Sequence, residues 1–161
     1  MKQSAYSFSF EEYDSIDELT KEDAALLKKA REVTRNAYAP YSKFYVGAAA
    51  VMKNGEIITG TNQENASYPA GICAERVLLS VAGSLFPNMP IETIAITHRP
   101  EKGASDHPVA PCGICRQSLK EFESRVKQPV RLILAGMEGK IHIISQASSL
   151  LPFAFSGDEL K

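Results

Sequence analysis

The three cysteines constrain this sequence more than any other feature, because they fall in two short segments that each open a predicted helix. Cys73 begins the segment CAE, and Cys112 and Cys115 follow a proline with C-x-x-C spacing. At the start of a helix this spacing turns two sulfurs toward one point, and the helix N-terminus favours thiolates. Because Cys73 also starts a helix, a third thiolate can face the pair. We predict that the three cysteines bind one zinc ion.

The number of ligands bears on what the zinc would do. Three protein ligands and an open fourth position are typical of a catalytic zinc, whereas structural sites usually close with four. Two alternatives stay open at this point. The C-x-x-C spacing also occurs in redox pairs, and His98, His107 or His142 could supply the fourth ligand of a structural site.

Glu75 favours the catalytic interpretation, because it lies two residues after Cys73 and therefore beside the metal rather than on it. Zinc lowers the pKa of its bound water to about 7, and a neighbouring carboxylate can take up and deliver protons. The alternative is an exposed charge in the favourable first turn of a helix. We predict that Glu75 is the proton shuttle of a hydrolytic reaction.

Arg76 and Arg116 each follow a predicted ligand closely. Three thiolates around Zn²⁺ leave a negative site, which weakens the ion as a Lewis acid. We expect at least one of the two guanidinium groups to donate hydrogen bonds to a thiolate sulfur and so reduce this charge. The alternative for either arginine is a surface salt bridge.

Helical and extended patterns alternate along the rest of the chain. Thr20 resembles a helix cap, and apolar residues then recur at helical spacing until the helix stops before Pro40. Asn54-Gly55 between two apolar runs predicts a two-residue hairpin turn. Further helices are expected from Cys73 and Cys112, strands at 92–98, 130–136 and 140–144, and a short helix with a tail over 148–160. This order predicts an α/β fold with a mixed sheet covered by helices.

Length and composition indicate a single domain over residues 1–161, with residues 1–15 as an N-terminal arm. Apolar residues make up 44% of the sequence, which is enough for a core. A net charge of −1 speaks against a protein that binds nucleic acid. Residues 28–31 carry three basic side chains, but Glu32 follows them, so a solvated helix face is the preferred interpretation.

The N-terminal sequence and the cysteines also indicate a cellular location. No run approaches the roughly 18 apolar residues needed to span a membrane. The N-terminus is acidic and has no apolar signal core. An odd count of three cysteines cannot form a closed disulfide framework. We therefore expect a cytoplasmic protein without a membrane partner.

The segments CAER and PCGICRQ resemble the cytidine deaminase family, in particular its small homotetrameric form with three cysteine ligands. Zinc deaminases as a class carry a glutamate that is not a ligand, followed by P-C-x-x-C. The resemblance extends to YSKFYVGAAAV, to GTNQENASYPAGICAER and to the C-terminal SSLLPFAFSGDEL, and so covers roughly residues 20–161. It implies a three-layer α/β/α fold with a mixed five-stranded sheet, and one Zn²⁺ per chain.

The resemblance also assigns roles to residues outside the zinc motif. Phe44 would stack on the pyrimidine ring, and Asn62 and Glu64 would hydrogen-bond the ribose hydroxyls. The backbone of Ala74 would help to hold the base edge. The alternatives are that Phe44 is a core residue and that Asn62 and Glu64 are turn residues of a loop.

A homotetramer with active sites at subunit interfaces is implied as well. Tyr68 and Phe155 would complete the substrate site at or near subunit contacts, with Phe155 reaching the active site of a neighbour. The alternative for Phe155 is a simple interface anchor. Two segments extend the family pattern: the loop over residues 99–111 is longer than in compact relatives, and the N-terminal arm is additional. Either could change the interface or the rim of the pocket.

The implied activity is zinc-dependent hydrolytic deamination of cytidine and 2′-deoxycytidine to uridine and 2′-deoxyuridine plus ammonia, in pyrimidine nucleoside salvage. Glu75 would give a proton to N3 of the base, take up the hydroxyl proton and pass it to the departing amine. An antibiotic nucleoside deaminase would share the zinc motif, but Asn62 and Glu64 favour an ordinary pyrimidine nucleoside. A polynucleotide deaminase usually has His in place of Cys73 and a basic surface. A non-catalytic zinc-stabilised binding domain would need four protein ligands.

Overall fold

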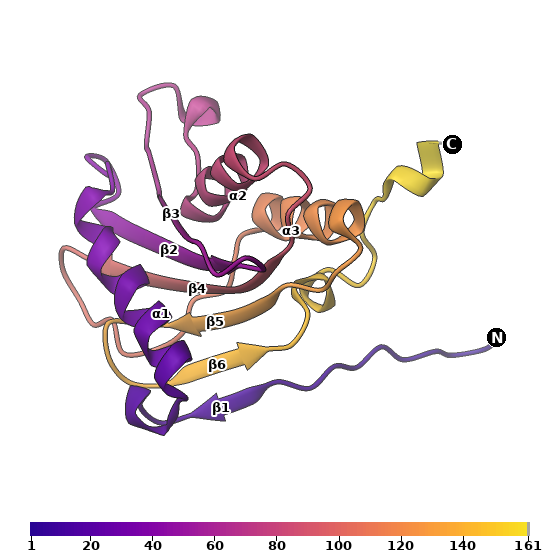
Figure 1. Ribbon diagram of the computed structural model, residues 1–161, viewed down its shortest axis with the longest axis horizontal. Coiled ribbons are helices and arrows are strands. Elements are labelled where there is room, and N and C mark those ends of the chain that lie inside the picture. Colours follow the sequence, from indigo (N-terminus) through magenta and orange to yellow (C-terminus); the bar gives the residue numbers. More distant parts are fainter. Residues whose placement is uncertain (161) are drawn as a thin grey trace.

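A six-stranded mixed sheet forms the middle of the computed structural model, which describes residues 1–160 (Figure 1). Its strands are β1 (Glu11–Tyr13), β2 (Phe44–Met52), β3 (Ile57–Thr61), β4 (Ile91–Pro100), β5 (Arg131–Ala135) and β6 (Ile141–Ile144). The strand order is β1-β6-β5-β4-β2-β3, with β4 and β5 parallel and the other neighbours antiparallel. The predicted α/β fold with a mixed sheet is confirmed.

Helices cover both faces of this sheet. They are α1 (Lys21–Val33), α2 (Ala74–Leu85) and α3 (Gly113–Val126). Alternate residues of β4 point to opposite faces: Ile94 and Ile96 pack in the cluster that contains α2 and α3, and Ala95 packs in the cluster that contains α1. Figure 1 shows α1 on one side of the sheet and α2 beside α3 on the other. No helix among residues 1–160 is long and apolar enough to cross a membrane.

Helix α1 begins as the sequence predicts and ends earlier. The hydroxyl of Thr20 accepts a hydrogen bond from the backbone N–H three residues later, at 3.2 Å. The helix ends at Val33 and a 3₁₀ turn continues to Asn36. The hydroxyl of Thr34 donates to the carbonyl of Arg31 at 2.8 Å, a local bond that competes with helix continuation.

Three details differ from the predicted pattern. The sheet has six strands rather than five, because β1 of the N-terminal arm pairs with β6. The β2–β3 turn has three residues between the hydrogen-bonded Met52 and Glu56 rather than two, with Gly55 at φ +86°. The predicted C-terminal helix is a pair of 3₁₀ turns at Ala147–Leu150 and Gly157–Leu160, the first of them followed closely by Pro152.

Candidate active site

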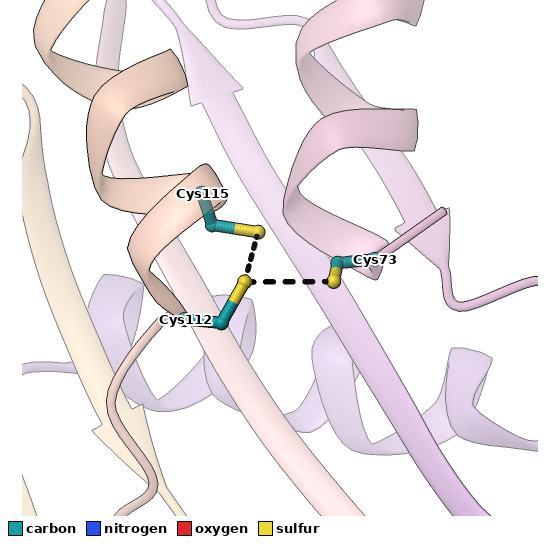
Figure 2. A group of neighbouring side chains, drawn as sticks. All are labelled: Cys73, Cys112 and Cys115. Carbon is teal, nitrogen blue, oxygen red and sulfur yellow. Dashed lines mark hydrogen bonds between the residues drawn. The ribbon is translucent and has the colours of Figure 1, made fainter. Parts of the chain in front are cut away.

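The three cysteine sulfurs converge where the starts of α2 and α3 meet (Figure 2). The Sγ atoms of Cys73 and Cys112 are 3.8 Å apart, those of Cys112 and Cys115 are 3.5 Å apart, and all three lie within 4.8 Å of one another. These separations are far longer than the roughly 2.05 Å of a disulfide. The structure therefore brings the predicted ligands together as three free thiols.

The spacing of the sulfurs fits a tetrahedral zinc ion. Two thiolates at about 2.3 Å from a tetrahedral zinc lie about 3.8 Å apart, which is close to the observed separations. The group of ligand atoms within 4.8 Å of one another consists of these three sulfurs, so within residues 1–160 no histidine or carboxylate joins them. A set of three thiolates with one position left open matches the donor set of a catalytic zinc site.

Each sulfur owes its place to a helix start. Cys73 is the residue before α2 and Cys112 the residue before α3, and neither side chain caps its own helix. Cys115 lies in the first turn of α3 and is buried. Partial positive charge at both helix N-termini points to the sulfurs and favours thiolates there.

The pKa values of the thiols reflect their mutual contact. The thiol of Cys115 donates toward the sulfur of Cys73, which lowers the pKa of Cys73 to about 6 and raises the pKa of Cys115. A thiolate at Cys73 is thus favoured, and the hydrogen bond from the Cys115 thiol stabilises it. A divalent cation would favour the loss of the remaining thiol protons.

Glu75 is a buried carboxyl beside the sulfurs, with 5% of its surface exposed. Burial raises its pKa above the ordinary value, although its own backbone N–H and the Cys115 thiol act in the opposite direction. Its charge in turn disfavours thiolates at Cys73 and Cys115. A buried carboxyl that takes up a proton more readily than usual, next to three metal-ligating sulfurs, is suited to proton transfer.

The two arginines differ in what they contact. The positive charge of Arg76 helps to lower the pKa of Cys73. Arg116 donates from Nε to the carbonyl of Pro111 at 2.8 Å and from Nη1 to the carbonyl of Leu150 at 3.1 Å. These two bonds hold the turn that carries Cys112. A hydrogen bond from an arginine to a thiolate stays a prediction. Arg76 is the better candidate, because its charge acts on Cys73 while Arg116 already donates to two carbonyls.

The three histidines lie apart from the sulfur group. His142 pairs with Glu12 at 2.9 Å on β6, and His107 pairs with Asp106 at 3.0 Å in the loop before α3. His98 is buried on β4 and stacks on Phe44. A histidine as fourth ligand therefore has no support from their positions.

Asn62 and Glu64 hold backbone around the start of β2. The amide of Asn62 accepts from the N–H of Val46 at 2.7 Å and donates to the carbonyl of Phe44 at 2.8 Å. The carboxylate of Glu64 accepts from the backbone N–H groups of Tyr41 and Ser42 at 2.9 and 3.2 Å. Burial raises the pKa of Glu64, but the Ser42 side chain and these two N–H groups outweigh it, so the pKa is lowered.

Next to these residues is a hollow of about 410 Å³. It is lined by Tyr41, Ser42, Glu64, Asn65, Tyr68 and Gly71. A larger hollow of about 670 Å³ lies between α2 and α3 and is lined by Arg76 but by none of the cysteines. No cysteine lines the smaller hollow either, but it includes Gly71, two residues before Cys73.

The other four residues predicted to contact the substrate differ in their exposure to solvent. Phe44 is half-buried, and Ala74 is fully buried at the start of α2. Tyr68 and Phe155 are 75% and 59% exposed, and the carbonyl of Phe155 accepts a hydrogen bond from the Gln117 amide at 2.8 Å. Two large aromatic side chains in solvent are suited to contacts with another chain.

Two residues that position the site are missing from the sequence prediction. A Cβ on Gly60 would lie 2.4 Å from the carbonyl oxygen of Ala74, so only glycine allows β3 to approach the start of α2 this closely. An isolated glycine inside a strand pattern was the available signal. For His98 the sequence favours a packed or solvated side chain over a zinc ligand, and no sequence pattern indicates its stacking on Phe44.

Comparison with known proteins adds a family to this geometry. Residues 20–130 match the family described as the cytidine and deoxycytidylate deaminase zinc-binding region. Cytidine deaminase from Halalkalibacterium halodurans is 39% identical over 137 residues, which cover 84% of this chain and 95% of that protein. Cytidine deaminase from Sporosarcina psychrophila is 39% identical over 135 residues, or 83% and 88% of the two chains.

A solved structure shares the fold as well. The crystal structure of cytidine deaminase from Burkholderia pseudomallei superposes with a TM-score of 0.71 at 37% identity. The match covers 85% of this chain and 100% of that one. This chain thus shares its fold with a cytidine deaminase over the whole length of that protein.

Proposed function

This chain belongs to the cytidine and deoxycytidylate deaminase family, and from that premise we propose that it hydrolyses cytidine and 2′-deoxycytidine to the uracil nucleosides and ammonia. The observation that carries this proposal is the buried carboxyl of Glu75 beside three convergent cysteine sulfurs. Each part is needed for the reaction: a site that activates water, and a group that moves protons between water, base and amine.

One zinc ion is the cofactor that fits Cys73, Cys112 and Cys115, and when bound it supplies Lewis-acid chemistry that lowers the pKa of water. Glu75 performs the proton transfers. Its raised pKa lets it deliver a proton to N3 of the base, which makes C4 more electrophilic. That proton comes from the attacking water. As the oxygen of water bonds to C4 and the C4–N4 bond breaks, Glu75 passes the second water proton to the amine, which leaves as ammonia.

The substrate would be held by the start of β2 and the loop after β3. Phe44 offers a ring face to the pyrimidine, and the backbone of Ala74 holds the base edge. Asn62 and Glu64 bind the ribose hydroxyls through the polar atoms that their backbone bonds orient. A carboxylate that already accepts two N–H bonds is fixed in place, so a ribose hydroxyl meets an acceptor that loses little freedom on binding.

We further propose a homotetramer in which Tyr68 and Phe155 reach a neighbouring subunit. Both rings are exposed; Tyr68 lies five residues before Cys73, and the carbonyl of Phe155 accepts from Gln117, two residues after Cys115. Sedimentation equilibrium should give four chains per particle, and a monomer at micromolar concentration would contradict it.

Residues 1–161 would act as one catalytic domain with an N-terminal arm, in pyrimidine salvage. The location would be the cytoplasm, a compartment in which three free thiols remain reduced.

Cytidine turnover tests the activity, read as the fall in absorbance when cytidine becomes uridine, beside a zinc-to-chain ratio. We expect one zinc per chain and loss of turnover with a chelator. Glu75→Gln should keep zinc and lose turnover by a factor of about 10²–10⁴, the range for general acid–base groups. Glu22→Gln is the matched control, because Glu22 lies in the first turn of α1 and is exposed.

The outcomes separate the rival functions. No cytidine turnover by zinc-loaded protein would favour a zinc-stabilised binding domain. Faster turnover of a cytosine-containing oligonucleotide than of cytidine would favour a polynucleotide deaminase. Full turnover by Glu75→Gln would remove Glu75 from the proton transfers.

A further inference from the structure

The ring of His98 covers one face of the Phe44 ring. Their centroids are 5.1 Å apart and their planes differ by 15°. His98 pairs across the β2–β4 ladder with Val46, two residues after Phe44, so both rings lie on the same face of the sheet. This is the face that α2 and α3 cover, because Val46 packs against their core cluster. An aromatic ring has two faces, so a base that stacks on Phe44 must use the one opposite His98.

His98 is fixed by packing. It is 2% exposed, and its Nδ1 is buried without a hydrogen-bond partner among residues 1–160. Burial and the nearby His107 lower the pKa of His98, more than the Ala135 backbone and Asp106 raise it. The ring is therefore neutral near pH 7 and can stack on the Phe44 ring without the cost of burying a charge.

The loop over residues 101–112, between β4 and α3, also contacts His98; we call it the Ser105 loop. The hydroxyl of Ser105 donates to the carbonyl of His98 at 2.5 Å and accepts from the N–H of Met137 at 2.8 Å. The carbonyl of Ser105 accepts from the N–H of Glu138 at 3.0 Å. These bonds fasten the loop to the β5–β6 turn, and the ring of His107 then lies 5.4 Å from that of His98.

We propose that His98 is a positioning residue for nucleoside binding, which acts through Phe44, and that the Ser105 loop holds it in place. The proposal rests on the proposed function, in which Phe44 stacks on the pyrimidine. The Phe44 backbone is already held by the Asn62 amide. Stacking on His98 restrains the side chain, which can otherwise rotate about its Cα–Cβ and Cβ–Cγ bonds. A ring that is ordered before the substrate arrives loses less freedom on binding.

The test compares three side chains at position 98. His98→Leu fills the space but removes the aromatic face, and it should raise KM for cytidine about three- to tenfold with kcat within twofold, the range expected for one aromatic contact. His98→Phe loses the contact of the imidazole with the Ala135 backbone but keeps a neutral ring against Phe44, and it should restore a KM within twofold of the wild type. Ser105→Ala, which frees the loop, should raise KM about two- to fivefold. The zinc-to-chain ratio should stay at one in all variants.

A purely structural role predicts another pattern. It would lower the urea midpoint of unfolding in His98→Leu and leave KM of the folded enzyme unchanged. An unchanged KM in whichever of His98→Leu and Ser105→Ala folds, or equal KM values for His98→Leu and His98→Phe, overturns the proposal while cytidine turnover by the wild type stands. Absence of turnover by the wild type would overturn the proposed function and this inference together.

Discussion

Replacing Glu123 by alanine is expected to lower the free energy of unfolding by about 3–5 kcal/mol. Glu123 lies near the end of α3 and is buried. Its carboxylate accepts three backbone N–H bonds: from Val130 at 2.8 Å, from Ala147 at 3.0 Å and from Ser148 at 3.2 Å. One side chain thus joins α3 to the residue before β5 and to the turn that follows β6.

The magnitude follows from these three bonds. A hydrogen bond to a charged group contributes about 1.5–3 kcal/mol, so the three together contribute about 4.5–9 kcal/mol. Two effects reduce the loss in the alanine variant: the cost of burying a carboxylate disappears, and water can enter to bond the freed N–H groups. The net is about 3–5 kcal/mol, a large part of the roughly 5–15 kcal/mol typical of a domain.

Urea denaturation of the zinc-loaded protein measures this loss, at one protein concentration for all variants because assembly would add to apparent stability. Glu123→Gln should lose less, about 1–3 kcal/mol, because its amide oxygen can still accept from two of the three N–H groups. Glu121→Ala is the control, an exposed glutamate on the same helix. If Glu123→Ala and Glu121→Ala unfold within about 1 kcal/mol of each other, the carboxylate does not join the three segments as described.

Three further predictions concern the site and the arm. Gly60→Ala should lower stability by about 1–3 kcal/mol and reduce turnover, because the added Cβ meets the first carbonyl of α2 at 2.4 Å. Gly83→Ala in α2 is the control: with nothing closer than 3.5 Å, it should leave turnover unchanged and stability equal or up to about 1 kcal/mol higher. Arg76→Gln should weaken zinc retention or turnover, and unchanged values of both would remove Arg76 from a role at the thiolates. Glu12 has a pKa below its ordinary value of 4.5, chiefly through its hydrogen bond to Lys140. The stability that the ionised Glu12 gives to the pairing of β1 with β6 is therefore fully present above pH 4.5 and is lost as the pH falls through the lowered pKa. Amide exchange in β1 should rise over that acidic range relative to β4, and equal protection throughout would contradict this link.

The zinc ligands could be predicted from the sequence because their geometry is local. A cysteine immediately before a helix and a C-x-x-C across a helix start place their sulfurs at helix N-termini whatever the rest of the chain does. Glu75 is fixed relative to Cys73 by the same first turn. What the sequence could not specify is that the two helix starts meet, since this depends on α2 and α3 lying side by side on one face of the sheet.

The missed features depend on pairs of residues that are distant along the chain. Strand β1 has the sequence EEY, which lacks the apolar alternation of a strand, and its pairing depends on the free edge of β6 and on Lys140 and His142 beside Glu12. Glu123 in the sequence is one of several charges on an amphipathic helix. Its burial becomes visible only when β5 and the turn after β6 bring their N–H groups to it.

The active-site geometry therefore depends on two kinds of residue that respond differently to substitution. In the proposed function the cysteines and Glu75 carry the chemistry, and their replacement would remove a zinc ligand or a proton carrier. Gly60 and His98 carry none, yet the first sets how closely β3 approaches the start of α2 and the second sets the ring against which Phe44 rests. Because close-packed interiors transmit small displacements, a change at Gly60 moves the start of α2, whereas a change at His98 loosens the ring of Phe44. Variants of Gly60 and His98 should keep their zinc and lose turnover or substrate binding by small factors, whereas Glu75→Gln should lose turnover by a factor of about 10²–10⁴.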